Sequence, residues 1–105
     1  MESRINDFLL SIIIPVLNEQ NNIKPLLNRL LPIIKDYKYE VIFIDDGSTD
    51  NTNSEIKKYT SKNSNIKLIS FYRNFGHQMA LSCGYSKASG DCIISMDSDL
   101  QDPPE

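Results

Sequence analysis

Four short apolar runs, separated by stretches with helical periodicity, place the strongest constraint on how this chain folds. The runs cover 8–16, 39–45, 66–71 and 92–96. The first two are nearly continuous in β-branched and other apolar residues, which is typical of strands covered on both faces. Alternating strands and helices favour right-handed crossovers and a parallel sheet. The chain of 105 residues is therefore predicted to be α/β, with residues 1–105 in a single unit.

The first helix is expected between the first two runs. Apolar residues recur there at spacings of three and four, from Ile23 to Ile34, which places them on one helix face. Pro32 lies inside this pattern, and we expect it to kink the helix or end it early because proline removes a backbone hydrogen bond.

Two further helices are expected. The second covers 54–61, with Thr49 or Asp50 as the residue that caps its start. The third covers 76–89 and is expected to end at Gly90, because glycine commonly terminates a helix.

Composition excludes some classes of protein. The formal net charge of −3 and the lack of a Lys/Arg cluster argue against a nucleic-acid binder. Cys83 and Cys92 lack metal-ligand spacing and read as reduced, buried thiols of a cytoplasmic protein. Residues 1–7 are polar, and we do not expect them to act as a signal peptide. No apolar run approaches the roughly 18 to 20 residues that a membrane span requires.

Polar residues follow each of the four apolar runs. In parallel α/β sheets, ligands bind at the carboxyl ends of the strands. The residues that carry chemistry should therefore cluster directly after each run, and they do so at 15–19, 45–50, 72–76 and 97–102.

The fourth cluster has the pattern of a metal site. Asp97 and Asp99 are one residue apart after an apolar run, and Gln101 adds a neutral oxygen. Mg²⁺ and Mn²⁺ favour such oxygen ligands and complete their coordination with water and substrate phosphates. A solvated acidic turn would have the same local sequence, but the position after a predicted strand favours the metal.

The second cluster indicates recognition of a base. Asp45 and Asp46 are adjacent at the end of a buried run, and because adjacent carboxylates repel each other, at least one requires a partner. A carboxylate can accept the ring N–H of uracil or guanine. A capping turn without a ligand would explain Gly47 to Asp50, but it would not explain the paired aspartates.

The remaining polar candidates have more than one interpretation. Glu19 contacts a ligand or places a negative charge at a helix start. Arg73 contacts phosphate or base, or forms a surface ion pair. His77 either caps a helix or contacts substrate, and it is not assigned as a base.

Other nucleotide-binding classes fit less well. The glycine-rich loop of dinucleotide-binding dehydrogenases and the Walker loop are both missing. A sugar nucleotidyltransferase would need a glycine-rich loop with a following basic residue after the first run. A receiver domain would need its acidic pair there, where this chain has 15–19.

Four motifs, in order, resemble those of the family-2 glycosyltransferases. They occupy 11–19, 41–50, 73–80 and 97–105, and they span nearly the whole chain. The resemblance is closest to the polyprenyl-phosphate branch, which includes dolichol-phosphate mannosyltransferases, bactoprenol glucosyltransferases and undecaprenyl-phosphate aminoarabinose transferases. It implies a GT-A fold, which is Rossmann-like, with a mostly parallel sheet.

The same resemblance implies an activity. A sugar would be transferred, with inversion, from a nucleotide-sugar donor to an acceptor. The resemblance favours UDP over GDP as the nucleotide of the donor, and a polyprenyl phosphate as the acceptor. Asp46 would meet the base with support from Asp45. Asp97, Asp99 and Gln101 would hold the divalent metal, Mg²⁺ or Mn²⁺. The implied nucleotide-sugar contacts are Pro15, Leu17, Glu19, Asp45, Asp46, Arg73, Asp97 and Ser98.

Members of this family continue well beyond the position of Glu105, so residues 1–105 correspond to their N-terminal nucleotide-sugar-binding half. The catalytic base and acceptor site are expected downstream, and no catalytic base is assigned here. Membrane contact would come from those later parts, at the cytoplasmic membrane face of a full-length parent. The alternative is a truncated, non-catalytic nucleotide-binding or interaction module of the same fold. Such a fragment also has an open sheet edge that could pair between copies in a homo-oligomer.

Overall fold

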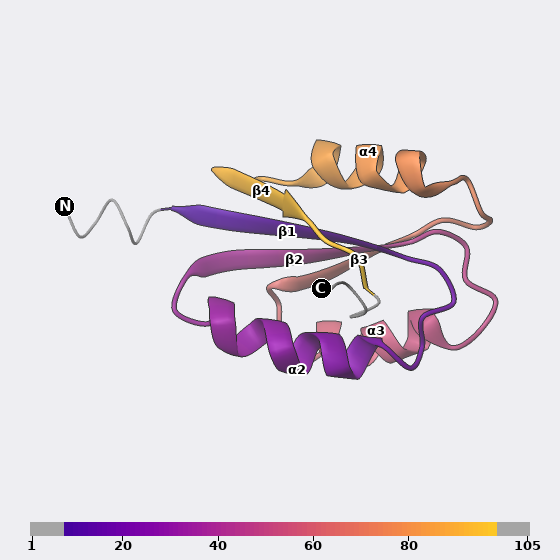
Figure 1. Cartoon of the computed structure of the whole chain (residues 1–105), viewed down its shortest axis with the longest axis horizontal. Helices are drawn as coiled ribbons and strands as arrows, with labels where there is room; N and C mark the ends of the chain where they lie inside the picture. The colour runs from indigo at the N-terminus through magenta and orange to yellow at the C-terminus, as the bar shows by residue number, and fades with distance from the viewer. Residues whose placement is uncertain (1–7, 99–105) are drawn as a thin grey trace, which may run out of the picture.

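Four parallel strands form one sheet in the order β3-β2-β1-β4. The structure is a computed structural model that describes residues 8–98. The strands and helices alternate along the chain as predicted (Figure 1). The elements are β1 Leu9–Val16, α2 Ile23–Ile34, β2 Lys38–Asp45, α3 Thr52–Thr60, β3 Ile66–Ser70, α4 His77–Lys87 and β4 Cys92–Ser95.

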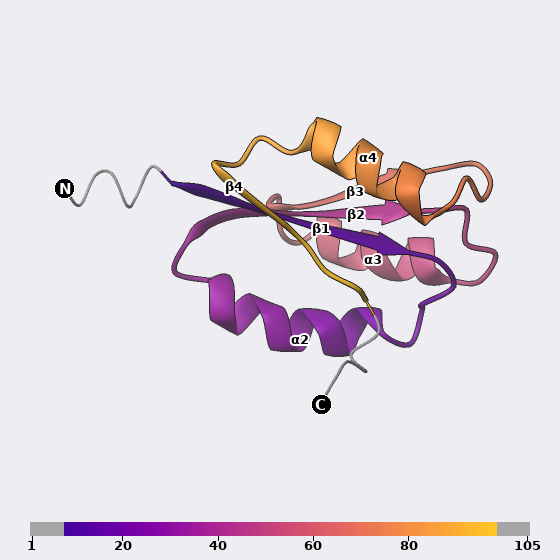
Figure 2. The same ribbon diagram turned by 45° about the horizontal axis from the view of Figure 1, so that its top comes forward.

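Helices cover the sheet on both faces, with α2 and α3 on one side and α4 on the other (Figures 1 and 2). Alternate residues of the central strand β1 serve the two layers, because successive side chains in a strand point to opposite faces. Ile12 and Ile14 pack in the larger apolar cluster with residues of α2 and α3, whereas Ile13 packs with Ala80 of α4. This two-sided burial explains the continuous apolar runs of β1 and β2.

Helix α2 buries the apolar face that its periodicity predicts, namely Ile23, Leu26, Leu27, Leu30 and Ile34. Of the two effects expected of Pro32, a kink or an early end, the early end is wrong, because α2 continues to Ile34. Pro32 lies on the exposed side of the helix. The carbonyl four residues earlier, which proline cannot pair, therefore faces water, where it can be solvated.

Helix α3 begins at Thr52, two residues before its predicted start at 54. Asn51, rather than Thr49 or Asp50, occupies the capping position, and its side chain makes no capping hydrogen bond. Asp50 still acts on the helix start, because its carboxylate accepts hydrogen bonds from both the backbone N–H and the hydroxyl of Thr52. The capping function is thus present one residue away from the capping position.

Helix α4 ends at Lys87, earlier than predicted, and Gly90 lies in the connection to β4 rather than at the helix end. A Cβ at position 90 would overlap the side chain and backbone of Ser11 in β1. Gly90 is therefore required for the close approach of this connection to β1.

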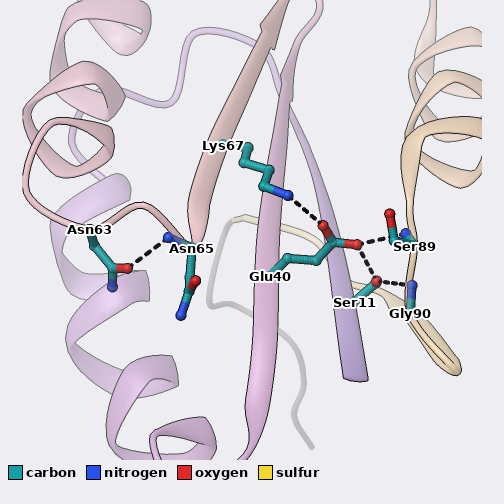
Figure 3. A network of polar contacts seen from close by, with 7 residues as sticks. All are labelled: Ser11, Glu40, Asn63, Asn65, Lys67, Ser89 and Gly90. Atoms are coloured by element: carbon teal, nitrogen blue, oxygen red, sulfur yellow. Dashed lines mark hydrogen bonds and ion pairs between the residues drawn. The ribbon is translucent and has the colours of Figure 1, made fainter. Parts of the chain in front are cut away.

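A buried carboxylate fixes the same connection (Figure 3). Glu40 of β2 is 3% exposed and accepts hydrogen bonds from the backbone N–H of Ser89 at 2.7 Å and from Lys67 Nζ at 2.8 Å. The hydroxyl of Ser11 donates to Glu40 and accepts from the N–H of Gly90. The network joins β1, β2, β3 and the start of β4 at the edge of the sheet opposite the carboxyl ends.

Two other expectations concern thiols and membranes. Cys83 and Cys92 are free, but both are half-buried rather than buried, because α4 and β4 form an outer part of the fold. Among residues 8–98, no helix combines the length and the apolar character needed to cross a membrane.

Candidate functional site

A pocket of about 430 Å³ opens at the carboxyl ends of β1 and β2, between the start of α4 and the segment after β4. This is the position that the rule for parallel sheets predicts, and the volume lies in the range of small-molecule sites. The described residues that line it are Pro15, Val16, Leu17, Glu19, Asp46, Asn74, Gly76, His77, Ala80, Asp97 and Ser98.

The end of β1 and the turn after it supply Pro15, Leu17 and Glu19 to the pocket. Asn18 between them has a positive φ of 53°, a conformation that asparagine tolerates better than most residues. Its side-chain oxygen accepts a 2.8 Å hydrogen bond from the N–H of Thr49. The turn after β1 is thereby attached to the turn after β2, which fixes the direction in which Leu17 and Glu19 leave the strand.

Adjacent aspartates at the end of β2 have different surroundings. The Asp45 carboxylate, 2% exposed, accepts from the N–H of Ser48 at 2.9 Å and from Asn53 Nδ2 at 3.0 Å. Asp45 does not line the pocket. Its hydrogen bonds hold the turn that leads into α3, so Asp45 stabilises this turn without lining the pocket.

Asp46 lines the pocket and is 4% exposed. Its Oδ1 accepts from the N–H of Phe75 at 2.7 Å, and its Oδ2 accepts from the N–H of Gly76 at 3.0 Å and from Asn74 Nδ2 at 3.2 Å. The repulsion between the two aspartates is therefore offset by separate sets of donors, one in the turn after β2 and one in the loop before α4.

Arg73 begins this loop but is not among the residues that line the pocket. Its guanidinium carbon lies 4.3 Å from the centre of the Phe75 ring, a distance at which a cation–π interaction forms. Phe75 in turn makes an edge-on contact with Phe71. In this structure the aromatic residues beside the pocket, rather than the pocket itself, hold the Arg73 side chain.

The segment after β4 brings Asp97 and Ser98 to the pocket. Asp97 is exposed, and Ser98 is 4% exposed. Asp99 and Gln101, the other expected metal ligands, lie outside the described residues. Within 8–98 there is no cluster of three His, Cys, Asp or Glu side chains able to hold a metal. The donor chemistry nevertheless fits a hard cation, since Asp97 presents a carboxylate to the pocket.

Five residues that line the pocket are not among the nucleotide-sugar contacts that the sequence predicts. They are Val16, Asn74, Gly76, His77 and Ala80. Asn74 belongs to the polar motif after β3, but nothing in the sequence distinguishes it from its neighbours as a pocket residue. His77, for which the sequence predicts a capping role or a substrate contact, begins α4 and lines the pocket.

The parallel sheet, with helices on both faces, is that of the GT-A glycosyltransferases. The chain belongs to the family described as Glycosyl transferase family 2, which matches residues 11–105. This family is the one that the sequence motifs predict.

The curated relatives are named as transferases. An uncharacterized glycosyltransferase of Synechocystis sp. is 44% identical over 98 residues, which cover 91% of this chain and 31% of the relative. The undecaprenyl-phosphate 4-deoxy-4-formamido-L-arabinose transferase of Pseudomonas fluorescens is 40% identical. This match covers 90% of this chain and 29% of the relative. The chain thus spans about 30% of the length of these relatives.

Solved structures show the same fold with ligands. Residues 1–349 of TarS of S. aureus in complex with UDP-GlcNAc have a TM-score of 0.76 and 31% identity, and the match covers 88% of this chain and 27% of that TarS chain. A mannosyltransferase of Pyrobaculum calidifontis in complex with GDP-Man and Mn²⁺ has a TM-score of 0.75 and 26% identity, covering 86% of this chain and 27% of the enzyme. Both are similar to this chain over most of its length.

Proposed function

We propose that residues 1–105 form the nucleotide-sugar donor site of an inverting glycosyltransferase. The observation that carries the proposal is that one pocket gathers Glu19, Asp46 and Asp97 from the ends of three different strands. Pro15, Leu17 and Ser98 line the same pocket. In this proposal Asp46 accepts the ring N–H of the base, and Asp97 lies on the side of the diphosphate.

The charge of the pocket supports a metal-dependent donor site. Glu19, Asp46 and Asp97 are all acidic, and none of the described lining residues is Lys or Arg. A diphosphate would be repelled by these carboxylates unless a cation lay between them. The proposed ligands are Asp97, Asp99 and Gln101, and the cation is Mg²⁺ or Mn²⁺. When bound, this ion supplies the charge that stabilises a departing diphosphate.

The donor and acceptor are proposed more specifically. TarS binds UDP-GlcNAc, which supports UDP, whereas the Pyrobaculum enzyme binds GDP-Man and keeps GDP as the second candidate. The undecaprenyl-phosphate transferase of P. fluorescens supports a polyprenyl-phosphate acceptor, which would place the reaction at the cytoplasmic membrane face. A lipid phosphate is already anionic and therefore needs less help from a base than a hydroxyl does.

Matched substitutions test the proposal. In the full chain, Asp97→Asn should weaken UDP binding in the presence of Mn²⁺ by at least about tenfold, as the loss of groups that support a metal site commonly does. Once the metal is chelated, UDP should bind weakly to wild type and variant alike, so the difference between them should disappear. Asp36→Asn, an exposed aspartate between α2 and β2, is the control and should match the wild type. Equal losses with and without metal would contradict a metal role for Asp97.

A further inference from the structure

Exposed aromatic and thioether side chains gather at the loop that joins β3 to α4. Tyr72 is 78% exposed, Phe75 is 39% exposed, and Met79 in the first turn of α4 is 55% exposed. The centre of the Phe75 ring lies 5.4 Å from that of Tyr72 and 5.6 Å from that of Phe71. We call Tyr72, Arg73, Phe75 and Met79 the loop patch. Exposed apolar groups concentrated in one place commonly mark a contact surface.

Arg73 adds a positive charge to this apolar surface. Its guanidinium carbon lies 4.3 Å from the centre of the Phe75 ring and 5.8 Å from that of Tyr72. Neither ion pair among residues 8–98 involves Arg73. Since Arg73 is also exposed, its N–H groups can donate to an anion while the flat guanidinium stays on the rings.

The loop patch lies within a basic stretch of an otherwise acidic chain. Residues 56–90 contain no Asp or Glu, although the chain has 14 such residues and a net charge of −3. The cations of this stretch are Lys57, Lys58, Lys62, Lys67, Arg73 and Lys87. Lys58 and Lys67 already form ion pairs with glutamates, so the other four carry the charge available to a partner. The stretch includes the edge strand β3 and all of α4 (Figure 2). This asymmetry favours an anionic partner on this side of the molecule.

The loop patch is held in place by contacts with the end of β2. The Asp46 carboxylate, which is 4% exposed, accepts hydrogen bonds from the N–H of Phe75 at 2.7 Å and from the N–H of Gly76 at 3.0 Å. The backbone of Arg73 lies so close to Gly47 that a Cβ on Gly47 would overlap it. A surface that is already ordered loses less conformational entropy when it docks.

These features fit the surface of an anionic bilayer. Aromatic and other apolar side chains enter the boundary between headgroups and acyl chains, and arginine pairs with lipid phosphates at the same level. Single-stranded nucleic acid is also anionic and would stack its bases on the rings. Met79 favours the bilayer, because a flexible thioether gains from apolar surroundings but offers no plane for a base.

We propose that the loop patch docks on an anionic phospholipid surface, with its apolar side chains at the headgroup boundary and Arg73 on the lipid phosphates. This inference rests on the proposed function and adds to it. Gly76 and His77, which lie within the same segment, line the donor pocket. Docking therefore brings that pocket to the surface where a polyprenyl phosphate exposes its phosphate. Residues 72–79 thus contact the membrane themselves, in addition to any contact from later parts of a longer parent.

The test measures cosedimentation of the full chain with vesicles of phosphatidylcholine alone and of phosphatidylcholine mixed with phosphatidylglycerol. At low salt, the wild type should bind the anionic vesicles at least about fivefold more tightly, which is the contribution of one Lys or Arg near such a surface. The net charge of −3 alone predicts the opposite preference. High salt should remove the difference, because it screens the lipid charge.

Matched variants separate the loop patch from the rest of the surface. Tyr72→Ser combined with Met79→Ser should weaken binding to anionic vesicles about tenfold, because two apolar side chains no longer enter the boundary. Arg73→Gln should weaken it about fivefold and lower its salt dependence. The controls Tyr37→Ser and Arg29→Gln change the same residue types at exposed positions outside the patch and should match the wild type. Melting establishes that each variant is folded, and Arg73→Gln keeps the test open if the double variant fails to fold.

Titration of UDP with Mn²⁺ keeps the two proposals apart. The Tyr72→Ser, Met79→Ser variant should bind UDP as the wild type does, because neither side chain is among the described residues that line the pocket. A wild type that does not bind anionic vesicles, or controls that weaken binding as much as the patch variants do, would overturn membrane docking and leave the donor site intact. Patch-dependent binding of single-stranded RNA without vesicle binding would also overturn it. A wild type that binds vesicles but not UDP would overturn the donor site alone.

Discussion

Gly47 and Arg73 meet backbone against backbone where the turn after β2 lies beside the loop after β3. A Cβ on Gly47 would overlap the carbonyl carbon of Arg73 and the nitrogen of Asn74, and Gly47 also has a φ of 81°. This contact and the hydrogen bonds on Asp46 hold the same loop from two sides. The wall of the pocket that contains Asn74 and Gly76 therefore depends on residues at the end of β2.

Substitution of Gly47 should disturb both stability and the pocket. We expect Gly47→Ala to lower the free energy of unfolding by about 2–3 kcal/mol, because it combines a left-handed conformation with a steric overlap. Nucleotide affinity should fall as well, since the loop must move. Gly76→Ala is the comparison, because Gly76 has a φ of 107° but open space around it. Its cost should be smaller, about 1–2 kcal/mol, and denaturant titration measures both. If Gly47→Ala changed neither the free energy of unfolding nor the nucleotide affinity, the close contact between Gly47 and Arg73 would be contradicted.

Removal of the Glu40 carboxylate should destabilise the chain. Glu40→Ala leaves the Ser89 N–H and the Ser11 hydroxyl without their acceptor, and we expect a loss of about 2–4 kcal/mol in the free energy of unfolding. Glu55→Ala is the control, because Glu55 forms an exposed helix-surface pair with Lys58. Such a pair is worth roughly 0–1 kcal/mol. If the two variants lost similar amounts of unfolding free energy in denaturant titrations, the Glu40 network would not stabilise the fold.

The same carboxylate should make stability depend on pH. Burial raises the pKa of Glu40, but hydrogen bonds from Lys67, Ser11 and Ser89 outweigh it and hold this pKa below the usual 4.5. A lowered pKa in the folded state means that the unfolded chain takes up the proton first as pH falls. The contribution of Glu40 should therefore be complete above about pH 5 and decline as pH falls through the folded pKa, below 4.5.

Comparison of wild type with Glu40→Gln between pH 3 and pH 7, roughly the window that linkage defines, isolates this effect. Asp50 remains in both proteins, and its own pKa is also lowered: burial raises it, but hydrogen bonds from Thr52 outweigh burial. The stability difference between the two proteins should shrink as the solution becomes more acidic. A difference that is constant across this range would show that Glu40 acts by shape and not by charge.

Most of the fold is accessible from the sequence because the apolar pattern is strong. The continuous run in β1 and the spacing from Ile23 to Ile34 each follow from burial alone, so the strands and α2 appear where they are predicted. The errors concern helix ends. Pro32 is tolerated because it faces water, and Gly90 serves contact with Ser11 rather than helix termination. Both depend on long-range packing that a local pattern does not contain.

The pocket is predictable in part for a related reason. Parallel strands gather whatever follows them, and this places Glu19, Asp46 and Asp97 together. Loop geometry is not encoded in the same way. Arg73 and Asn74 are neighbours in sequence, yet Asn74 lines the pocket and Arg73 stacks on Phe75. The direction of each side chain depends on the hydrogen bonds of Asp46 to this loop.

Calorimetric titration of UDP into the full chain, first with Mn²⁺ and then with a chelator, tests the central claim most directly. The account predicts saturable binding of UDP that requires the metal, because the pocket carries three carboxylates and needs a cation to hold a diphosphate. UDP binding of equal strength after chelation, or no binding of UDP or GDP by a chain that melts cooperatively, would contradict a metal-dependent donor site.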